Sequence, residues 1–305
     1  MFNMAVDNWP TDIKVVIFDM DGTLYQEDTF MERYIRYLLE ETEHEADTEA
    51  AVSMGKAIRS GEQTFGFGHF YHLKDDLLVI RLEDGLARGY AWDGSSVPVR
   101  KKLYKFDSIL AADLLHIGDP WNIVAMLSHR YKLPETKLSK AFDRVRKEML
   151  AAPYQFEIHS GLMQAIEKLN VDKKVLMTNT HLESGAQFLD FMQIHFCFDE
   201  VYCDAGKPAR LTTYLASLLQ QGYKAHEILS VGDNPWNDLH PVKRIGGRTC
   251  FISPYPSHDP EVWDLRLTTL DELEQLMCAI GKQQMKEEMK DGTNPAEGNL
   301  QEIQG

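Results

Sequence analysis

The hydrophobic pattern near the start of the chain predicts a short buried strand. Five of the six residues at positions 13–18 are apolar, and Asp19 and Asp21 follow directly. A continuous apolar run of this length is typical of a parallel strand with both faces covered, and its carboxyl end is where open α/β sheets bind ligands. Because two buried carboxylates so close together repel each other, the pattern favours a divalent cation beside them. Gly22 and Thr23 would let the chain turn away sharply, although Asp-Gly also occurs in turns without chemistry.

Two later segments, residues 174–178 and 228–231, are also predicted to be strands that end in polar groups. A lone lysine lies between them in a Gly-Pro loop. In chain order, the polar groups are Thr178, Asn179, Lys207, Asp233 and Asp238. Each has a structural alternative, because hydroxyl, amide and carboxylate side chains often cap helices and lysine is common in exposed loops. Taken alone, none of these segments predicts an active site.

In their order along the chain, these segments resemble the haloacid-dehalogenase-like superfamily of phosphohydrolases. In that family a strand ends in Asp-x-Asp-Gly-Thr, a second strand ends in Ser or Thr, a lysine follows, and Gly-Asp-x4-Asp closes the site. All four motifs are present here in that order, and the matched core covers about half of the chain. The resemblance implies an α/β fold with a Rossmann-like, doubly wound parallel sheet.

The resemblance also implies an aspartyl-phosphate mechanism. Asp19 would attack phosphorus, and Asp21 would protonate the leaving oxygen and later take a proton from the attacking water. Thr178 and the backbone N–H of Asn179 would hold phosphate oxygens. Lys207 would neutralise charge on the phosphate and on Asp19.

A phosphomonoester dianion resists attack by a carboxylate, so this chemistry calls for a cation. Mg²⁺ prefers oxygen ligands and bridges carboxylate and phosphate. The implied ligands are the carboxylates of Asp19 and Asp233 and the backbone carbonyl of Met20. Asp238 would bind the metal directly or through water, or would orient Lys207.

The core is predicted to be split around a large insertion. Residues 11–25 and 156–282 would form the core, with Ser160 capping its first helix after the insertion. Residues 26–155 resemble a type 1 cap, which is usually a helical lid, and we call this segment the cap. From residue 283 onward the chain is polar and has no apolar face, which predicts a disordered tail at 283–305.

Apolar residues at helical spacing predict cap helices near residues 30–39 and 138–149, and Asp119-Pro120 is a good start for a third. Residues 77–92 do not fit a plain helical cap, because two apolar runs flank Glu-Asp-Gly as in a β-hairpin. The acidic stretch at 40–49 is expected to be a solvated face or loop.

Composition agrees with a soluble, cytoplasmic enzyme. The chain has 305 residues, 44% of them hydrophobic, which is enough for two packed domains. A formal net charge of −15 argues against nucleic acid or an anionic membrane as partner. The N-terminus lacks the pattern of a signal peptide. The four cysteines form no C-x-x-C pair and are expected to be reduced and mostly buried.

These observations predict a magnesium-dependent phosphatase that hydrolyses a small phosphomonoester such as a nucleotide or sugar phosphate. The alternatives are a phosphomutase of the same superfamily and a non-catalytic binding protein with the same fold. The dehalogenase branch is disfavoured because its site needs neither the second aspartate nor the metal pair. The sequence leaves the substrate and the oligomeric state open. Weaker candidates for substrate contact are His69, His72, Arg100, Lys101, Lys102, Lys105, His129, Arg130, His181 and Trp236.

Overall fold

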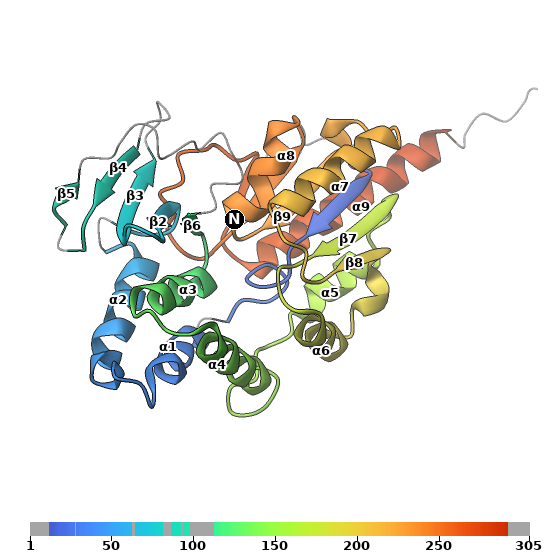
Figure 1. Cartoon of the computed structure of the whole chain (residues 1–305). Helices are drawn as coiled ribbons and strands as arrows, with labels where there is room; N and C mark the ends of the chain where they lie inside the picture. The colour runs from blue at the N-terminus through green and yellow to red at the C-terminus, as the bar shows by residue number, and fades with distance from the viewer. Residues whose placement is uncertain are drawn as a thin grey trace, which may run out of the picture.

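A computed structural model describes most of the chain and shows a parallel core sheet beside a separate group of helices and antiparallel strands (Figure 1). The described residues are 12–27, 29–62, 65–81, 87–92, 94–97 and 113–291.

Six parallel strands form the core sheet in the order β11-β10-β9-β1-β7-β8. They are β1 (Val15–Phe18), β7 (Lys173–Met177), β8 (Glu200–Tyr202), β9 (Ile228–Gly232), β10 (Arg248–Ile252) and β11 (Leu265–Leu267). The three strands predicted to carry catalytic groups are neighbours, because β1 pairs with β7 on one side and with β9 on the other. The predicted α/β fold with a Rossmann-like parallel sheet is confirmed.

Strand β1 is apolar throughout because both of its faces are covered. Val16 and Phe18 belong to the large hydrophobic cluster that includes residues of α5 (Ser160–Glu167) and α9 (Leu270–Asp291). Val15 and Ile17 belong to a second cluster with residues of α7 (Ala209–Gln220) and α8 (His240–Arg244). Since successive side chains of a strand point to opposite faces, helices cover both sides of the sheet.

Two details of the core differ from the sequence prediction. Helix α5 is capped by His159 and not by Ser160, because the imidazole Nδ1 of His159 accepts the N–H of Leu162 at 3.1 Å. Helix α9 continues to Asp291, so the predicted tail is helical over its first residues. The Lys, Glu, Gln and Met residues there have high helix propensity and extend a helix that is already nucleated. Residues 292–305 lie outside the described part of the chain.

Four helices lie within the cap: α1 (Phe30–Leu39), α2 (Thr48–Ser60), α3 (Pro120–Arg130) and α4 (Glu135–Glu148). The predicted apolar stripe of α1 is buried at all six positions. Asp119 caps α3 as predicted, since its Oδ1 accepts the N–H of Asn122 at 2.8 Å. The acidic stretch at 40–49 joins α1 to α2 and is exposed or half-buried throughout.

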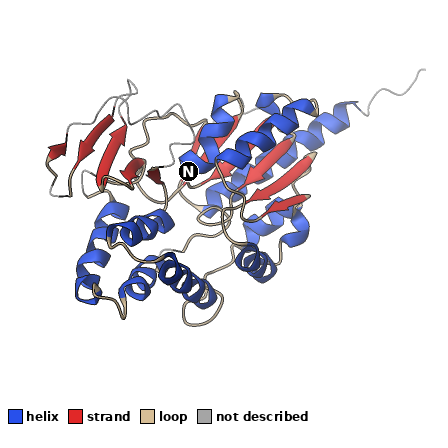
Figure 2. Ribbon diagram, in the orientation of Figure 1, coloured by secondary structure: helices blue, strands red, loops and turns tan. Residues whose placement is uncertain are grey.

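The predicted hairpin is part of a larger antiparallel sheet (Figure 2). Its five strands, in the order β5-β4-β3-β2-β6, are β2 (His69–His72), β3 (Leu77–Arg81), β4 (Ala87–Tyr90), β5 (Ser96–Val97) and β6 (Leu114–Ile117). Pairing of β3 with β4 confirms the hairpin, whose turn lies outside the described residues. The sequence pattern did not predict β2 and β6, because both strands carry histidines and they pair across a long stretch of chain.

Short helical turns occur at η2 (Glu45–Asp47), η3 (His195–Cys197), η4 (Ala225–Glu227) and η5 (Pro235–Leu239). All four cysteines are free thiols, and two of them, Cys197 and Cys250, are buried. Among the described residues, we find no helix that combines the length and the apolar character needed to cross a membrane.

Candidate active site

The carboxyl ends of β1, β7 and β9 open into one cavity of about 190 Å³. The seven side chains to which the family resemblance assigns a role all line it: Asp19, Asp21, Thr178, Asn179, Lys207, Asp233 and Asp238. Met20 does not line the cavity. Its carbonyl accepts the N–H groups of Leu24 (2.9 Å) and Thr23 (3.3 Å), so the turn after β1 uses the oxygen that was predicted to bind the metal.

The turn after β1 brings this strand against the loop after β9. Gly22 has a left-handed backbone (φ +76°), and a Cβ added there would lie 2.1 Å from Oδ2 of Asp233. Glycine is therefore required both by its backbone conformation and by the close approach of the carboxylate. Thr23 donates from Oγ1 to Asp19 Oδ2 at 3.3 Å, which orients the proposed nucleophile.

Lys207 is buried between two carboxylates. Its Nζ donates to Asp19 Oδ1 and to Asp238 Oδ1, both at 2.6 Å. Burial lowers the pKa of Lys207, but the attraction of both carboxylates outweighs this effect, so the pKa lies above its ordinary value. Asn179 holds the lysine backbone, because its Oδ1 accepts the Lys207 N–H at 2.8 Å and its Nδ2 donates to the Lys207 carbonyl at 3.3 Å.

Asp19, Asp233 and Asp238 form a buried cluster whose ligand oxygens lie within 4.8 Å of one another. Burial raises the pKa of Asp233 well above its ordinary value, and repulsion from Asp119 and Asp19 raises it further. Burial also raises the pKa of Asp19, which the attraction of Lys207 offsets only in part. Three clustered oxygen donors with this unfavourable charge fit a hard divalent cation such as Mg²⁺.

Asp238 has contacts on both carboxylate oxygens. Oδ1 accepts from Lys207, and Oδ2 accepts the backbone N–H of Asn234 at 3.1 Å. The sequence left open whether Asp238 binds the metal or orients Lys207. A direct contact supports orientation of Lys207, and the carboxylate cluster also keeps Asp238 near the proposed cation.

Asp21 is surrounded by hydrogen-bond donors. Its Oδ1 accepts from Arg146 and from the hydroxyl of Tyr25, and its Oδ2 accepts from Thr180 at 2.7 Å and Thr178 at 3.4 Å. Burial raises the pKa of Asp21, but the positive charge of Arg146 and these hydrogen bonds outweigh it, so the pKa lies below its ordinary value.

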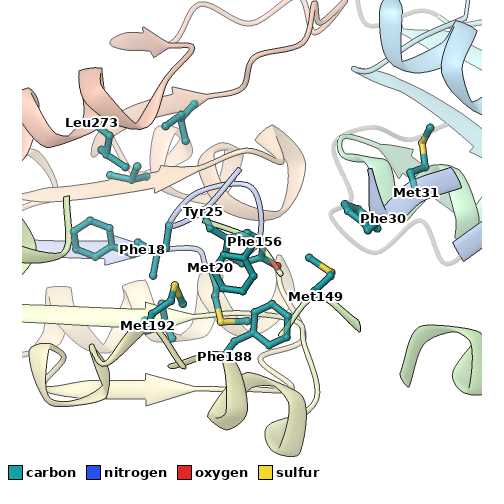
Figure 3. Close-up of a cluster of buried hydrophobic side chains, with 14 of the residues drawn as sticks. Phe18, Met20, Tyr25, Phe30, Met31, Met149, Phe156, Phe188, Met192 and Leu273 are labelled. Atoms are coloured by element: carbon teal, nitrogen blue, oxygen red, sulfur yellow. The ribbon is translucent and has the colours of Figure 1, made fainter. Parts of the chain in front are cut away.

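Aromatic side chains pack against Tyr25 and Arg146, the two residues that donate to Asp21 Oδ1. Tyr25 stacks on Phe156 with ring centroids 4.3 Å apart, and Phe156 stacks on Phe188 at 5.3 Å, as Figure 3 shows. The guanidinium carbon of Arg146 lies 3.4 Å from the centroid of the Phe188 ring. The Arg146 guanidinium is thus held between the Asp21 carboxylate and the face of the Phe188 ring, out of contact with water.

The cap supplies one wall of the cavity. Asp119, Trp121 and Asn122 reach it from the start of α3, and Phe142 reaches it from α4. From the sequence, Asp119 was expected only to begin a helix, and Arg146 and Thr180 were not candidates. Trp121 and Phe142 lie in predicted helices, where apolar spacing alone cannot separate a core residue from one that faces a cavity.

Of the weaker candidates that the structure describes, one lines the cavity and the others do not. His181 lines the cavity, where it is exposed and its Nδ1 lies 2.8 Å from Asp204. Trp236 packs against Phe70 and His116 instead. The described cap candidates, which are His69, His72, His129 and Arg130, do not line the cavity. Arg100, Lys101, Lys102 and Lys105 lie outside the described residues.

Comparison with protein families agrees with this geometry. A model of the haloacid dehalogenase-like hydrolases matches residues 13–246, which include every motif of the site. The chain therefore belongs to the haloacid dehalogenase-like hydrolase family, and the resemblance seen in its motifs is confirmed. No curated protein matches the sequence.

Several solved structures match most of the chain at low identity. YfnB from Bacillus subtilis, solved with magnesium bound, is 15% identical with a TM-score of 0.49, over 87% of this chain and 98% of that chain. A HAD phosphatase from Thermococcus onnurineus is 16% identical (TM-score 0.45), over 87% and 98% of the two chains. An L-2-haloacid dehalogenase from Xanthobacter autotrophicus is 14% identical (TM-score 0.45), also over 87% and 98%.

Proposed function

We propose that this hydrolase is a magnesium-dependent phosphatase that cleaves a small phosphomonoester through an aspartyl-phosphate on Asp19. The observation that carries the proposal is the position of Lys207, 2.6 Å from both Asp19 and Asp238, in the cavity that Asp233 also lines. A buried ammonium group bonded to two carboxylates provides a site where a phosphate dianion can meet an anionic nucleophile.

In the first step, the Asp19 carboxylate attacks phosphorus while the bond to the leaving alcohol oxygen breaks. Lys207 offsets charge on Asp19 and on the phosphate, and Thr178 and the Asn179 backbone hold the phosphate oxygens. Asp21 gives a proton to the leaving oxygen. The carboxylates of Asp19, Asp233 and Asp238 would hold magnesium, and its positive charge would lower the repulsion that the phosphate meets from Asp19.

In the second step, Asp21 takes a proton from water as the water oxygen attacks phosphorus. The bond between Asp19 and phosphorus breaks, which releases inorganic phosphate and restores the carboxylate. The donors around Asp21 favour its ionised form, which acts as the base in the second step, and they oppose the protonated form that the first step requires. The proton that Asp21 takes from water restores this protonated form for the next turnover. Asp21 and the three-carboxylate cluster both favour a phosphatase over a dehalogenase, which needs neither feature.

The lining of the cavity supports a substrate with one phosphate. Among its described lining residues, Lys207 is the only lysine or arginine. Asp119 adds a further carboxylate on the cap side. Within the described lining, a second phosphate would find no lysine or arginine besides Lys207 and would be repelled by Asp119, which disfavours the bisphosphate intermediate of a phosphomutase.

Release of inorganic phosphate from p-nitrophenyl phosphate and from a panel of phosphorylated metabolites, with Mg²⁺ present, tests the proposal. We expect turnover by the natural protein and none by Asp19→Asn. Acid quench during turnover should leave labelled phosphate on Asp19. If the natural protein hydrolyses no phosphate ester, a binding protein with the same fold becomes the better reading.

A further inference from the structure

Asn234 joins the metal-binding loop to the cap. It directly follows Asp233, and its side chain is buried. Its Nδ2 donates to Oδ2 of Asp119 at 2.7 Å, and its Oδ1 lies 3.0 Å from Nδ1 of His116. Asp119 and His116 belong to the cap, at the start of α3 and within β6. Both ends of one amide are therefore bonded to the cap.

The backbone of the cap also fits tightly against this amide. Gly118 lies between His116 and Asp119, and a Cβ added at Gly118 would lie 2.5 Å from Cγ of Asn234. Atoms that close have to move apart, so even a methyl group at position 118 would separate the cap from Asn234. The fit between Gly118 and Asn234 gives a way to loosen the contact without changing the loop itself.

On the other side, Asn234 is part of the loop that carries the proposed metal ligands. Its backbone N–H donates to Asp238 Oδ2 at 3.1 Å, and its Oδ1 also accepts the N–H of Asn237 at 3.3 Å. The loop is packed closely, since a Cβ at Gly232 would lie 2.4 Å from Asp238. A displacement of the Asn234 side chain is thus passed on to Asp233 and Asp238.

We propose that Asn234 is a positioning residue that couples cap docking to metal binding. With the cap docked, Asn234 holds Asp233 and Asp238 in the arrangement that suits a divalent cation. If the cap withdraws, the Asn234 amide loses its bonds to Asp119 and His116, and Asp119 Oδ2 loses the Asn234 donor, which is unfavourable for buried groups. Because coupling between two binding events is reciprocal, a bound cation also strengthens cap docking. This inference rests on the magnesium site of the proposed function, but it does not depend on turnover.

Hydrogen exchange of the natural protein gives the first test. We expect backbone amides of residues 116–122 to exchange more slowly with Mg²⁺ than without it, in the absence of any substrate. Residues 213–220 of α7, whose buried side chains belong to a hydrophobic cluster that contains no cap residue, serve as the internal control. Equal exchange of residues 116–122 in both conditions, with Mg²⁺ bound, would overturn the coupling.

Calorimetric titration with Mg²⁺ gives the second test. Gly118→Ala and Asn234→Ala should each bind Mg²⁺ more weakly, by about 5- to 150-fold, the usual range of such coupling. Gly281→Ala is the matched control, because a Cβ there meets no atom within 4 Å. Gly118 touches no proposed ligand, so unchanged Mg²⁺ affinity in a folded Gly118→Ala protein contradicts the proposal. If the natural protein binds no Mg²⁺ at all, the proposed function and this inference fail together; if it binds Mg²⁺ without coupling, only the inference fails.

Discussion

Arg146 of the cap helix α4 forms an ion pair with Asp21 at the end of the core strand β1. Both side chains are nearly excluded from water, with 3% and 12% of their surface exposed. Arg146 also donates to Ser184 of α6 (Leu182–Met192) and to the Tyr25 hydroxyl, both at 2.8 Å. Arg146 of the cap is thus held in place by Asp21, the core residue proposed to transfer protons.

Removal of Arg146 should therefore destabilise the protein strongly. Breaking a buried ion pair from one side leaves an uncompensated charge and costs about 3–5 kcal/mol. We expect Arg146→Met to lower the free energy of unfolding in urea by about this amount, and Arg146→Met with Asp21→Asn to recover part of the loss. Arg144→Met is the control, because Arg144 lies on the same helix but is half exposed, and exposed pairs contribute about 0–1 kcal/mol. An equal decrease in the free energy of unfolding for Arg146→Met and Arg144→Met would show that the buried pair stabilises the protein no more than the exposed one.

Asp21→Asn should separate the two chemical steps. With p-nitrophenyl phosphate the leaving group needs no proton, so Asp19 still becomes phosphorylated. Hydrolysis of the aspartyl-phosphate still needs a base, whose contribution is about 10²–10⁴-fold. We expect a burst of nitrophenolate of up to one equivalent per site, followed by very slow turnover, in a rapid-quench experiment. A Mg²⁺ titration of the variant controls for altered metal binding, and a label on a residue other than Asp19 would refute the mechanism.

Activity should require a hard divalent cation. The clustered ligands are all oxygens, which favours Mg²⁺ over Zn²⁺. We expect phosphate release to stop after chelation and to return when Mg²⁺ is added. Asp233→Asn should not be rescued by the same addition. Full activity of the chelated natural protein would remove the metal from the mechanism.

The cap carboxylate should select against a second phosphate. We expect kcat/KM for a sugar monophosphate to exceed that for its bisphosphate by about tenfold or more, which corresponds to ~1.4 kcal/mol. Asp119→Asn should narrow this ratio, because it removes the charge but keeps a side chain that caps α3 equally well. A ratio that stays the same in Asp119→Asn would assign the selection to another residue.

His69 should make the folded state sensitive to acid. Burial, together with the neighbouring His258 and His116, lowers the pKa of His69 to about 3, whereas the unfolded chain binds the proton near 6.5. The contribution of neutral His69 to the free energy of unfolding is therefore complete above about pH 6.5. It decreases as the pH falls toward 3, by up to ~1.4 kcal/mol per pH unit. In urea unfolding at pH 7, 6 and 5, the free energy of unfolding should depend less steeply on pH for His69→Asn, which keeps an acceptor for the Gly66 N–H. His129→Asn, at an exposed site on α3, should leave the slope unchanged.

The sequence was informative where local pattern decides structure. The apolar run before Asp19 identified the central strand, and its neighbours β7 and β9 were found in the same way. Because the ends of adjacent parallel strands meet at one edge of a sheet, the residues that follow them converge without any further information. The same reasoning found α1, α3 and α4 and the hairpin of β3 and β4.

Contacts between distant segments could not be read from the pattern. Arg146 lies on α4 far from Asp21 in sequence, and nothing in its helix distinguishes it from the exposed Arg144. Asp119 has the local role of an N-cap, which hid its contact with Asn234. The resemblance named the Met20 carbonyl as a metal ligand, but the sequence pattern did not reveal that this carbonyl also accepts the N–H groups of Thr23 and Leu24.

The central position of β1 has a consequence for biosynthesis. Val15 pairs with Lys173 on one side and with Ile228 on the other, so β1 has no partner in the core sheet until at least residue 173 has been made. The helices and antiparallel strands of the cap emerge in between and can collapse on one another earlier. We therefore expect the nascent chain to fold in an order that differs from its sequence, with the cap first and the core last. During that interval the apolar segment Val15–Phe18 is uncovered, which makes it the natural target for a chaperone and the segment most exposed to aggregation.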